Sequence, residues 1–216
     1  MKKISNIAIS LCIFLFIVSF ATVVTLNFRT LYYINVDSQN LAETSGYSQE
    51  TIIENYDILI DYNSIFNFSE LEFNGLEMSD EGKIHFEEVK AIFVGIQVLL
   101  ILTFIGTVFG VYKKIKQKDF DFLLMSSVIT IVLPVVLGTI IAINWQWCFI
   151  TFHKIAFRND YWIFDPIKDP IITLLPDSFF MQCAIMIVSI ILLISATMLV
   201  FWLVKKNNKI NDTIIN

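Results

Sequence analysis

The sequence predicts an all-α membrane protein: four transmembrane helices, with a mostly helical outer domain between helices 1 and 2. Of the 216 residues, 56% are hydrophobic, and the mean hydropathy is +0.69. One soluble core cannot bury that much apolar surface. The apolar residues also form four long segments, and clusters of lysine lie next to three of the segment ends. Both patterns are typical of a multi-pass membrane protein.

The first predicted span covers residues 7–26, close to the ~20 residues that a spanning helix requires. A cleaved signal peptide is the alternative interpretation. Its apolar core is typically roughly 7–15 residues long, and no A-x-A cleavage site follows the segment here. We therefore expect an uncleaved first transmembrane helix.

The whole chain is expected to form one membrane domain, residues 1–216, with further spans at 91–112, 122–143 and 179–204. The second span contains Gly106 and Gly110, a small-xxx-small pattern that allows two helices to approach closely. The third span contains Pro134 and is expected to bend there. Two long loops remain, residues 27–90 and 144–178.

The loop at residues 27–90 is strongly acidic, with 13 acidic residues against three basic ones. Ser48 is a candidate N-cap, and apolar residues recur after it at helical spacing. Ser79 is a second candidate N-cap, for a helix that begins with Asp80 and Glu81 and continues through His85 into the next span. The loop is therefore expected to be compact and mostly helical.

Lysine placement predicts the orientation. The N-terminus, residues 113–118 and the C-terminal tail with Lys205, Lys206 and Lys209 are all basic, and in a four-span protein they share one side. By the positive-inside rule that side is the cytoplasm. We thus expect a multi-pass protein of the cell membrane with both termini cytoplasmic and both long loops on the outer face. The net charge of −5 excludes a nucleic-acid partner.

Rare polar residues gather in the stretch 151–180, which carries His153, Arg158 and three of the four prolines. The other histidine, His85, lies six residues before the second span. His153 follows an aromatic cluster typical of a membrane–water boundary, so both imidazoles are expected at the level of the lipid headgroups. Glu88, at i+3 from His85, is placed to fix its tautomer.

Simpler interpretations exist for these residues. An interfacial histidine is commonly a hydrogen-bonded structural residue. Asp165 and Asp169 each precede a proline and are typical of turns. Arg158 can anchor a phospholipid phosphate or orient an anionic part of a substrate. Without an H-E-x-x-H or G-x-S-x-G motif, the sequence predicts no metal site and no cofactor.

The pattern F-H-x-x-x-F-x-N-D-x-W-x-x-D-P-x-x-D-P-I-I-x-x-x-P-x-x-F-F at 152–180 resembles a bacterial integral-membrane family that includes the lipoprotein intramolecular transacylase. The stretch S-D-E-x-x-x-H-F-x-x-V-K at 79–90 is similar to the second motif of that family. The layout of four spans with a large first outer loop also matches, so the resemblance covers nearly the whole chain.

The resemblance implies an acyltransferase acting on diacylated bacterial lipoproteins in contact with membrane lipid. It would move the sn-2 acyl chain to the N-terminal cysteine amine, giving a lyso-form lipoprotein. The implied catalytic residues are His85 and His153; we expect His85 to transfer the proton and His153 to assist it or to polarise the ester carbonyl. Substrate contacts are expected from Arg158, Asn159, Asp160 and Trp162, and support from Glu88, Asp165 and Asp169.

Two other functions remain open at this point. One is a non-enzymatic four-span scaffold or receptor with an acidic extracellular domain. The other is a phospholipid-directed acyltransferase or lipase. If the histidines act as expected, activity falls on acidification through a pKa near ~6.5, as the imidazole needed as base becomes protonated.

Overall fold

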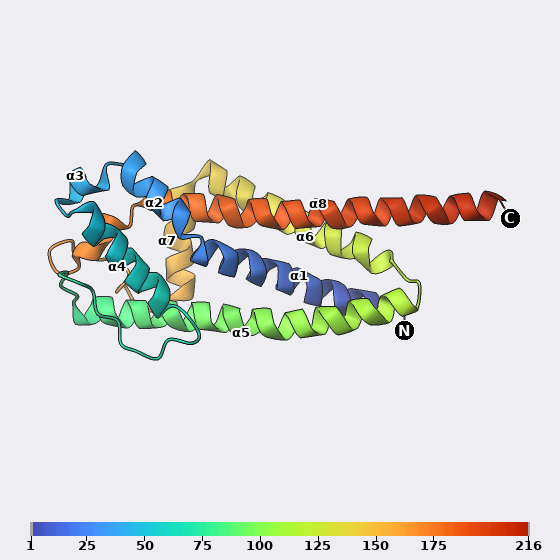
Figure 1. The fold of residues 1–216 in the computed structure, drawn as a ribbon, viewed down its shortest axis with the longest axis horizontal. Helices are drawn as coiled ribbons and strands as arrows, with labels where there is room; N and C mark the ends of the chain where they lie inside the picture. Colours follow the sequence, from blue (N-terminus) through green and yellow to red (C-terminus); the bar gives the residue numbers. More distant parts are fainter. Residues whose placement is uncertain (1, 216) are drawn as a thin grey trace. The chain divides into compact units, whose positions relative to one another are not determined.

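The computed structural model describes residues 2–215, and the side chains of residues 3–207. Within residues 2–215 the chain is helical or irregular, with no strand. Four helices are long and apolar enough to span a membrane (Figure 1), namely α1 (Lys2–Asn27), α5 (Asp80–Lys116), α6 (Asp121–Ile143) and α8 (Asp177–Ile215). The predicted all-α membrane fold is confirmed. The side chain of Lys209, which is part of the basic tail, lies outside the described residues.

The chain falls into two compact units. Unit 1 comprises residues 1–22, 98–140 and 185–216, and unit 2 comprises residues 23–97 and 141–184. Each long helix contributes residues to both units. The ends of the four spans, the single membrane domain and the outer position of the two loops stay predictions.

Unit 1 has a core of aliphatic side chains with Phe122 among them. The predicted small-residue pattern lies where α5 approaches α1. A Cβ atom on Gly110 would lie 2.2 Å from Ile9 Cδ1, and one on Gly106 would lie 2.8 Å from Cys12 Sγ. The two glycines therefore allow α5 to pack directly against α1, as the pattern predicts.

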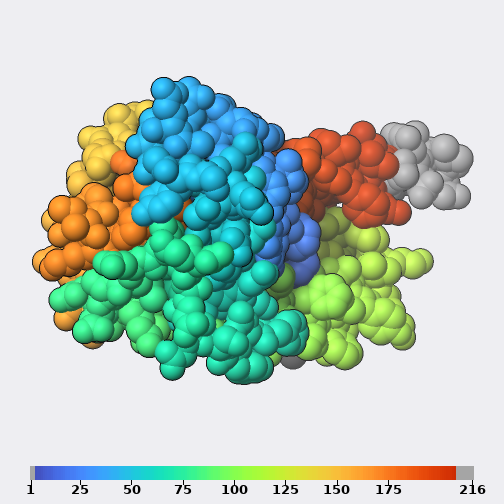
Figure 2. All heavy atoms as spheres, turned by 60° about the vertical axis from the view of Figure 1, so that its left-hand side comes forward, coloured from blue at the N-terminus to red at the C-terminus, as the bar shows by residue number. Residues whose placement is uncertain are grey.

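Unit 2 contains the shorter helices α2 (Arg29–Ser38), α3 (Leu41–Ser45), α4 (Gln49–Tyr62), α7 (Trp145–Ala156) and η1 (Pro170–Leu174). Tyr32 stacks on Tyr56 with ring centroids 3.7 Å apart, and Phe179 meets both rings edge-on. The Tyr32 hydroxyl donates to the Leu174 carbonyl at 2.7 Å. Figure 2 shows the side chains of α2, α3 and α4 packed together on the surface. The expected helical domain is thus present.

Both predicted N-caps are confirmed. The Ser48 hydroxyl accepts from the Thr51 amide at 3.1 Å, and α4 begins at the next residue. The Ser79 hydroxyl accepts from the Gly82 amide at 3.0 Å, and α5 begins at Asp80. Each cap satisfies an amide that has no partner inside its helix.

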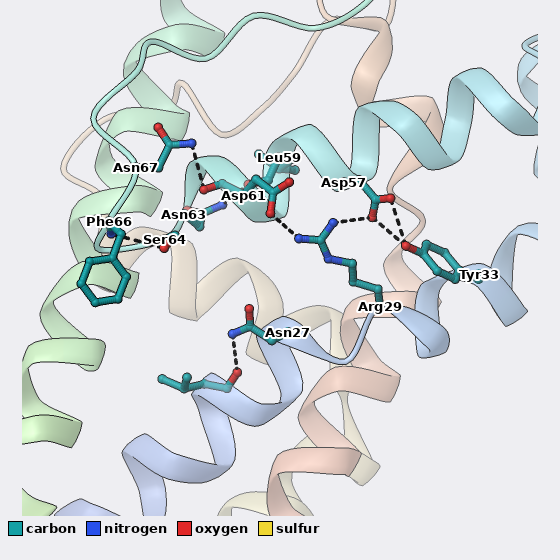
Figure 3. A network of polar contacts seen from close by, with 11 residues as sticks. Asn27, Arg29, Tyr33, Asp57, Leu59, Asp61, Asn63, Ser64, Phe66 and Asn67 are labelled. Carbon is teal, nitrogen blue, oxygen red and sulfur yellow. Dashed lines mark hydrogen bonds and ion pairs between the residues drawn. The ribbon is translucent and has the colours of Figure 1, made fainter.

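An ionic cluster joins the start of α2 to α4 (Figure 3). The Arg29 guanidinium pairs with Asp57 at 3.0 Å and also with Asp61. The Tyr33 hydroxyl donates to Asp57 at 2.8 Å. These contacts hold α4 against the segment that leaves α1.

Candidate functional site

The structure brings the two histidines together inside unit 2. His85 lies on α5 and His153 on α7, and their ring centroids are 6.2 Å apart with an interplanar angle of 31°. The two imidazoles therefore belong to one cluster of side chains. No group of three or more His, Cys, Asp and Glu side chains among residues 2–215 is arranged to hold a metal ion.

His85 sits in an aromatic enclosure and is only 5% exposed. Phe157 and Phe164 meet its ring edge-on, with centroids 4.7 and 5.3 Å away. The residue precedes the predicted span 91–112, on the part of α5 that also carries Glu87, Glu88 and Lys90. Burial, and secondarily the charge of His153, lower the pKa of His85 from 6.5 to about 4. It is a neutral imidazole at neutral pH.

His153 has a fixed tautomer. Its Nδ1 atom lies 2.7 Å from the Phe149 carbonyl oxygen, one helical turn earlier in α7. A carbonyl only accepts, so Nδ1 carries the proton and Nε2 keeps a lone pair. Burial lowers the pKa of His153, although the Phe149 carbonyl and Asp177 act against this. The neutral ring thus has its basic nitrogen at Nε2.

Aromatic rings enclose both imidazoles. Trp162 packs on His153 at 4.8 Å, and Phe149 packs on it at 4.1 Å. Within the described part of the chain, Trp162 Nε1 and His85 Nδ1 are buried and have no hydrogen-bond partner. Buried polar atoms are normally paired. Two unpaired ones in a single cluster are therefore available to a polar group of a substrate.

Glu88 holds the segment that follows α7. The Asn159 amide donates to both of its carboxylate oxygens, at 2.9 and 3.2 Å. Asn159 Oδ1 in turn accepts from the Tyr161 amide at 3.1 Å. The expectation from the sequence was that Glu88 fixes the tautomer of His85. Its hydrogen bonds instead go to Asn159, which lies two residues past Phe157, the C-cap of α7.

Asp169 holds the start of α5. Its carboxylate is buried and accepts from the Ser79 amide at 2.8 Å and from the Ser79 hydroxyl at 2.7 Å. A Cβ atom on Gly82 would lie 2.3 Å from Asp169 Oδ1, so only glycine leaves room for this contact. The bonds go to a residue 90 positions earlier, and not to the downstream amides that a turn aspartate would bind.

Asp165 does form the expected turn. Its Oδ1 accepts from the Ile167 amide at 3.0 Å, and its carbonyl accepts from the Asp169 amide at 2.8 Å. Arg158 and Asp160 are both exposed, and neither side chain has a hydrogen bond or ion pair within residues 2–215. Their charged ends are free to meet a substrate.

Sequence reasoning missed the rings around His85 and the carbonyl that orients His153. Phe149 and Phe157 lie four residues on either side of His153, which is the spacing of neighbours on a helix. Asn144, whose Oδ1 accepts from the Trp147 amide at 3.0 Å, caps this helix and was a usable signal. Nothing in the local sequence indicates that Phe164 reaches His85.

Comparisons with known proteins agree with this geometry. The family model for lipoprotein intramolecular transacylase Lit matches residues 7–180. The solved structure of Lit from Bacillus cereus is 38% identical, covers 97% of each chain and has a TM-score of 0.94. The structure of its H85R mutant is 37% identical, has a TM-score of 0.88, and the match covers 98% of this chain and 95% of that chain. The structure of its H85A mutant is also 37% identical, has a TM-score of 0.87, and the match covers 97% of this chain and 95% of that chain. A search of curated proteins gives no match.

The matched region contains most of α1 and all of α5, α6 and α7, together with both histidines and the residues that hold them. It extends over more than half of the chain, and the structural likeness extends over nearly all of it. The chain belongs to the lipoprotein intramolecular transacylase family.

Proposed function

We propose that this chain transfers the sn-2 acyl chain of a diacylglyceryl lipoprotein to the α-amine of its own N-terminal cysteine, with His85 and His153 as the catalytic pair. The observation that carries the assignment of roles is the contact between His153 Nδ1 and the Phe149 carbonyl at 2.7 Å. This contact places the proton of the neutral ring on Nδ1, so His153 Nε2 carries a lone pair inside the aromatic enclosure.

The reaction moves one acyl group and one proton. The amine nitrogen attacks the ester carbonyl carbon, the new C–N bond forms, and the bond from that carbon to the glyceryl oxygen breaks. The amine must lose a proton, and the leaving alkoxide must gain one. Free α-amines have a pKa of ~8, so a base is also needed to populate the neutral amine at neutral pH. Amine and ester belong to one molecule, so no second lipid has to be ordered.

His153 is the better candidate for the proton carrier. Nε2 accepts the proton from the amine and returns it to the glyceryl oxygen, while Nδ1 remains bonded to Phe149. This reverses the roles expected from the sequence. His85 is buried and neutral, and a neutral imidazole still has one N–H group. That group can donate to the oxyanion that develops on the carbonyl oxygen, in an enclosure where such a bond is strong.

The exposed residues after α7 suit the polar end of the substrate. We assign the Asp160 carboxylate to the N-terminal ammonium and the Arg158 guanidinium to peptide carbonyl groups, because both charges are unpaired within the described chain. Trp162 Nε1 offers a further donor. Asn159 and Glu88 hold this segment in place. The lysine distribution supports a site on the outer face of the cell membrane.

The test is mass spectrometry of the N-terminal lipopeptide of a lipoprotein co-expressed with each variant. At matched membrane abundance, His153→Ala and His85→Ala should each lower the N-acyl-lyso product by ~10²–10⁴-fold. The double variant should lose little more than either single variant, because the two residues act as one unit. Lys154→Gln, an exposed neighbour of His153, is the matched control and should keep full activity. Unchanged product in either histidine variant would refute the assignment.

A further inference from the structure

Two highly exposed phenylalanines lie in the loop that follows α4. Phe66 is 83% exposed and Phe68 is 91% exposed. Single exposed apolar residues are ordinary, but two large exposed rings two residues apart in one loop are typical of a contact surface. They take no part in the histidine cluster, and the proposed reaction does not use them.

The loop is a defined structure (Figure 3). The Phe66 amide donates to the Ser64 hydroxyl at 3.2 Å, and the Asn67 amide group donates to the Asp61 carbonyl at 3.0 Å. Asn67 Oδ1 accepts from the Ser69 amide at 2.8 Å. These bonds fix the backbone on both sides of Phe66 and Phe68, so the rings are presented outward by a fixed turn.

Gln97 fastens this loop to α5. Its Oε1 accepts from the Ile65 amide at 3.1 Å, and its Nε2 donates to the Asn63 carbonyl at 2.8 Å. Gln97 lies inside the predicted span 91–112, which contains no charged residue. It is six residues past Ala91, or ~9 Å further along the helix axis. An amide at that depth needs protein partners, and here the loop backbone supplies them.

A contact at the end of α4 relates this part of the chain to a second position along α5. Lys90, just before the apolar span, places its ammonium 4.0 Å from the centroid of the Tyr62 ring. A lysine at this point keeps its charge in the headgroup region. From the level of Lys90 to that of Gln97, α5 advances by ~10 Å. Tyr62 therefore lies at the level of Lys90, and Ile65 lies near the level of Gln97, closer to the membrane interior.

We propose that the loop at residues 64–68 inserts into the membrane leaflet that α5 enters after Lys90, with Phe66 and Phe68 in contact with phospholipid acyl chains. The loop is then an interfacial anchor, with apolar rings below the headgroups and a polar backbone held by Gln97. The inference goes beyond the proposed reaction, because it depends on neither histidine.

The experiment uses the full-length chain with a photoreactive diazirine analogue of phenylalanine at position 66 or 68. The protein is reconstituted in vesicles of phosphatidylcholine and phosphatidylglycerol, illuminated and analysed by mass spectrometry for lipid adducts. Position 50, occupied by an exposed glutamate at the opposite end of α4, is the matched control. We expect a several-fold higher yield of lipid adducts at 66 and 68 than at 50. Equal yields, or adducts of water alone at 66 and 68, would overturn the proposal.

Gln97→Leu tests the anchor itself. Leucine suits a membrane span, so the helix and the folded yield are preserved, but both hydrogen bonds to the loop are lost. Lipid adducts at position 66 should fall at least twofold in this variant. An unchanged yield would contradict the role of Gln97 in setting the depth of the loop. Acyl transfer measured on the same samples reports separately on the histidine pair.

Discussion

At the scale of single residues, the proposed mechanism requires that both imidazoles are neutral. Burial lowers the pKa of both, for His85 to about 4. A group that must be neutral supports activity above its pKa, and the activity is lost as the pH falls through that value. The acidic limb of the profile is therefore expected below 6.5. The sequence alone suggested a limb near ~6.5, because it contains no information about desolvation.

The pH profile of acyl transfer is a direct test. Purified protein should keep its activity as the pH falls through about 6.5, the ordinary value for histidine, and lose it only at lower pH. Trp162→Ala admits water to the His153 ring and should move the midpoint upward. The ratio of N-acyl-lyso to diacylglyceryl product is measured at each pH. A wild-type midpoint at or above 6.5 would contradict the buried, neutral pair.

The convergence of the histidines was predictable, but their roles were not. His85 and His153 are the only two histidines, and each precedes or follows an apolar segment, so the same depth follows from position alone. The tautomer of His153 depends on the Phe149 carbonyl, and hence on α7 being a helix. Glu88 was misjudged because helical spacing suggested a neighbour within α5, whereas its partner Asn159 arrives from a distant segment.

At the scale of elements, the start of α5 is held by its own N-cap and by a side chain from a distant segment. Ser79 caps the helix, and the buried Asp169 accepts two hydrogen bonds from Ser79. His85 lies on the second turn of this helix. The geometry of the site therefore depends on a contact that lies outside the cluster of rings.

We expect Asp169→Ala to destabilise unit 2 more than Asp165→Ala. The first change removes two hydrogen bonds that the half-buried Ser79 amide and hydroxyl donate to the buried Asp169 carboxylate, a loss of about 2–4 kcal/mol by the usual worth of bonds to a charged group. The second removes one exposed turn contact, worth about 1 kcal/mol. Thermal unfolding in detergent gives the comparison. An equal or larger loss for Asp165→Ala would show that the Ser79 contact is unimportant.

Elements with a clear period or cap were predictable from the sequence. The four long apolar helices and the caps Ser48 and Ser79 were all predicted. Residues 144–178 were expected to be a loop, and they contain α7 and η1. In α7, Trp145, Cys148, Phe149 and Phe152 recur at the i, i+3, i+4, i+7 spacing of one helix face, so the helical period was a usable signal that the aromatic content of the segment obscured.

At the scale of the whole molecule, orientation is the main expectation to test. Single cysteines at Ser48 and Lys168, both exposed, should react with an impermeant maleimide added to intact cells, in a background without Cys12, Cys148 and Cys183. A cysteine at Gln117, also exposed but beside the lysines in the last turn of α5, should react only after lysis. Labelling of Gln117 in intact cells would reverse the positive-inside assignment.

Composition predicted the membrane class and the four helices, but it left the function open. An acidic segment between two spans suits a receptor or scaffold as well as an enzyme. The resemblance of residues 79–90 and 152–180 to the transacylase family favoured the enzyme, and the match of the family model with the shared fold confirms that membership. The paired histidines then give the family membership a chemical basis in this chain.

Because α5 is continuous from His85 to Gln97, the distance between these residues along the helix axis is fixed. No residue breaks the helix between them, so His85 stands ~9 Å above Ala91 whatever the surrounding lipid. In a thinner or thicker bilayer the substrate ester lies at a different distance from the membrane centre. The His85 imidazole keeps its position along α5, so the two groups no longer lie at the same level. Such mismatch costs fractions of a kcal/mol per Å. Turnover in vesicles of graded acyl-chain length should therefore peak at one thickness and decline on both sides of it.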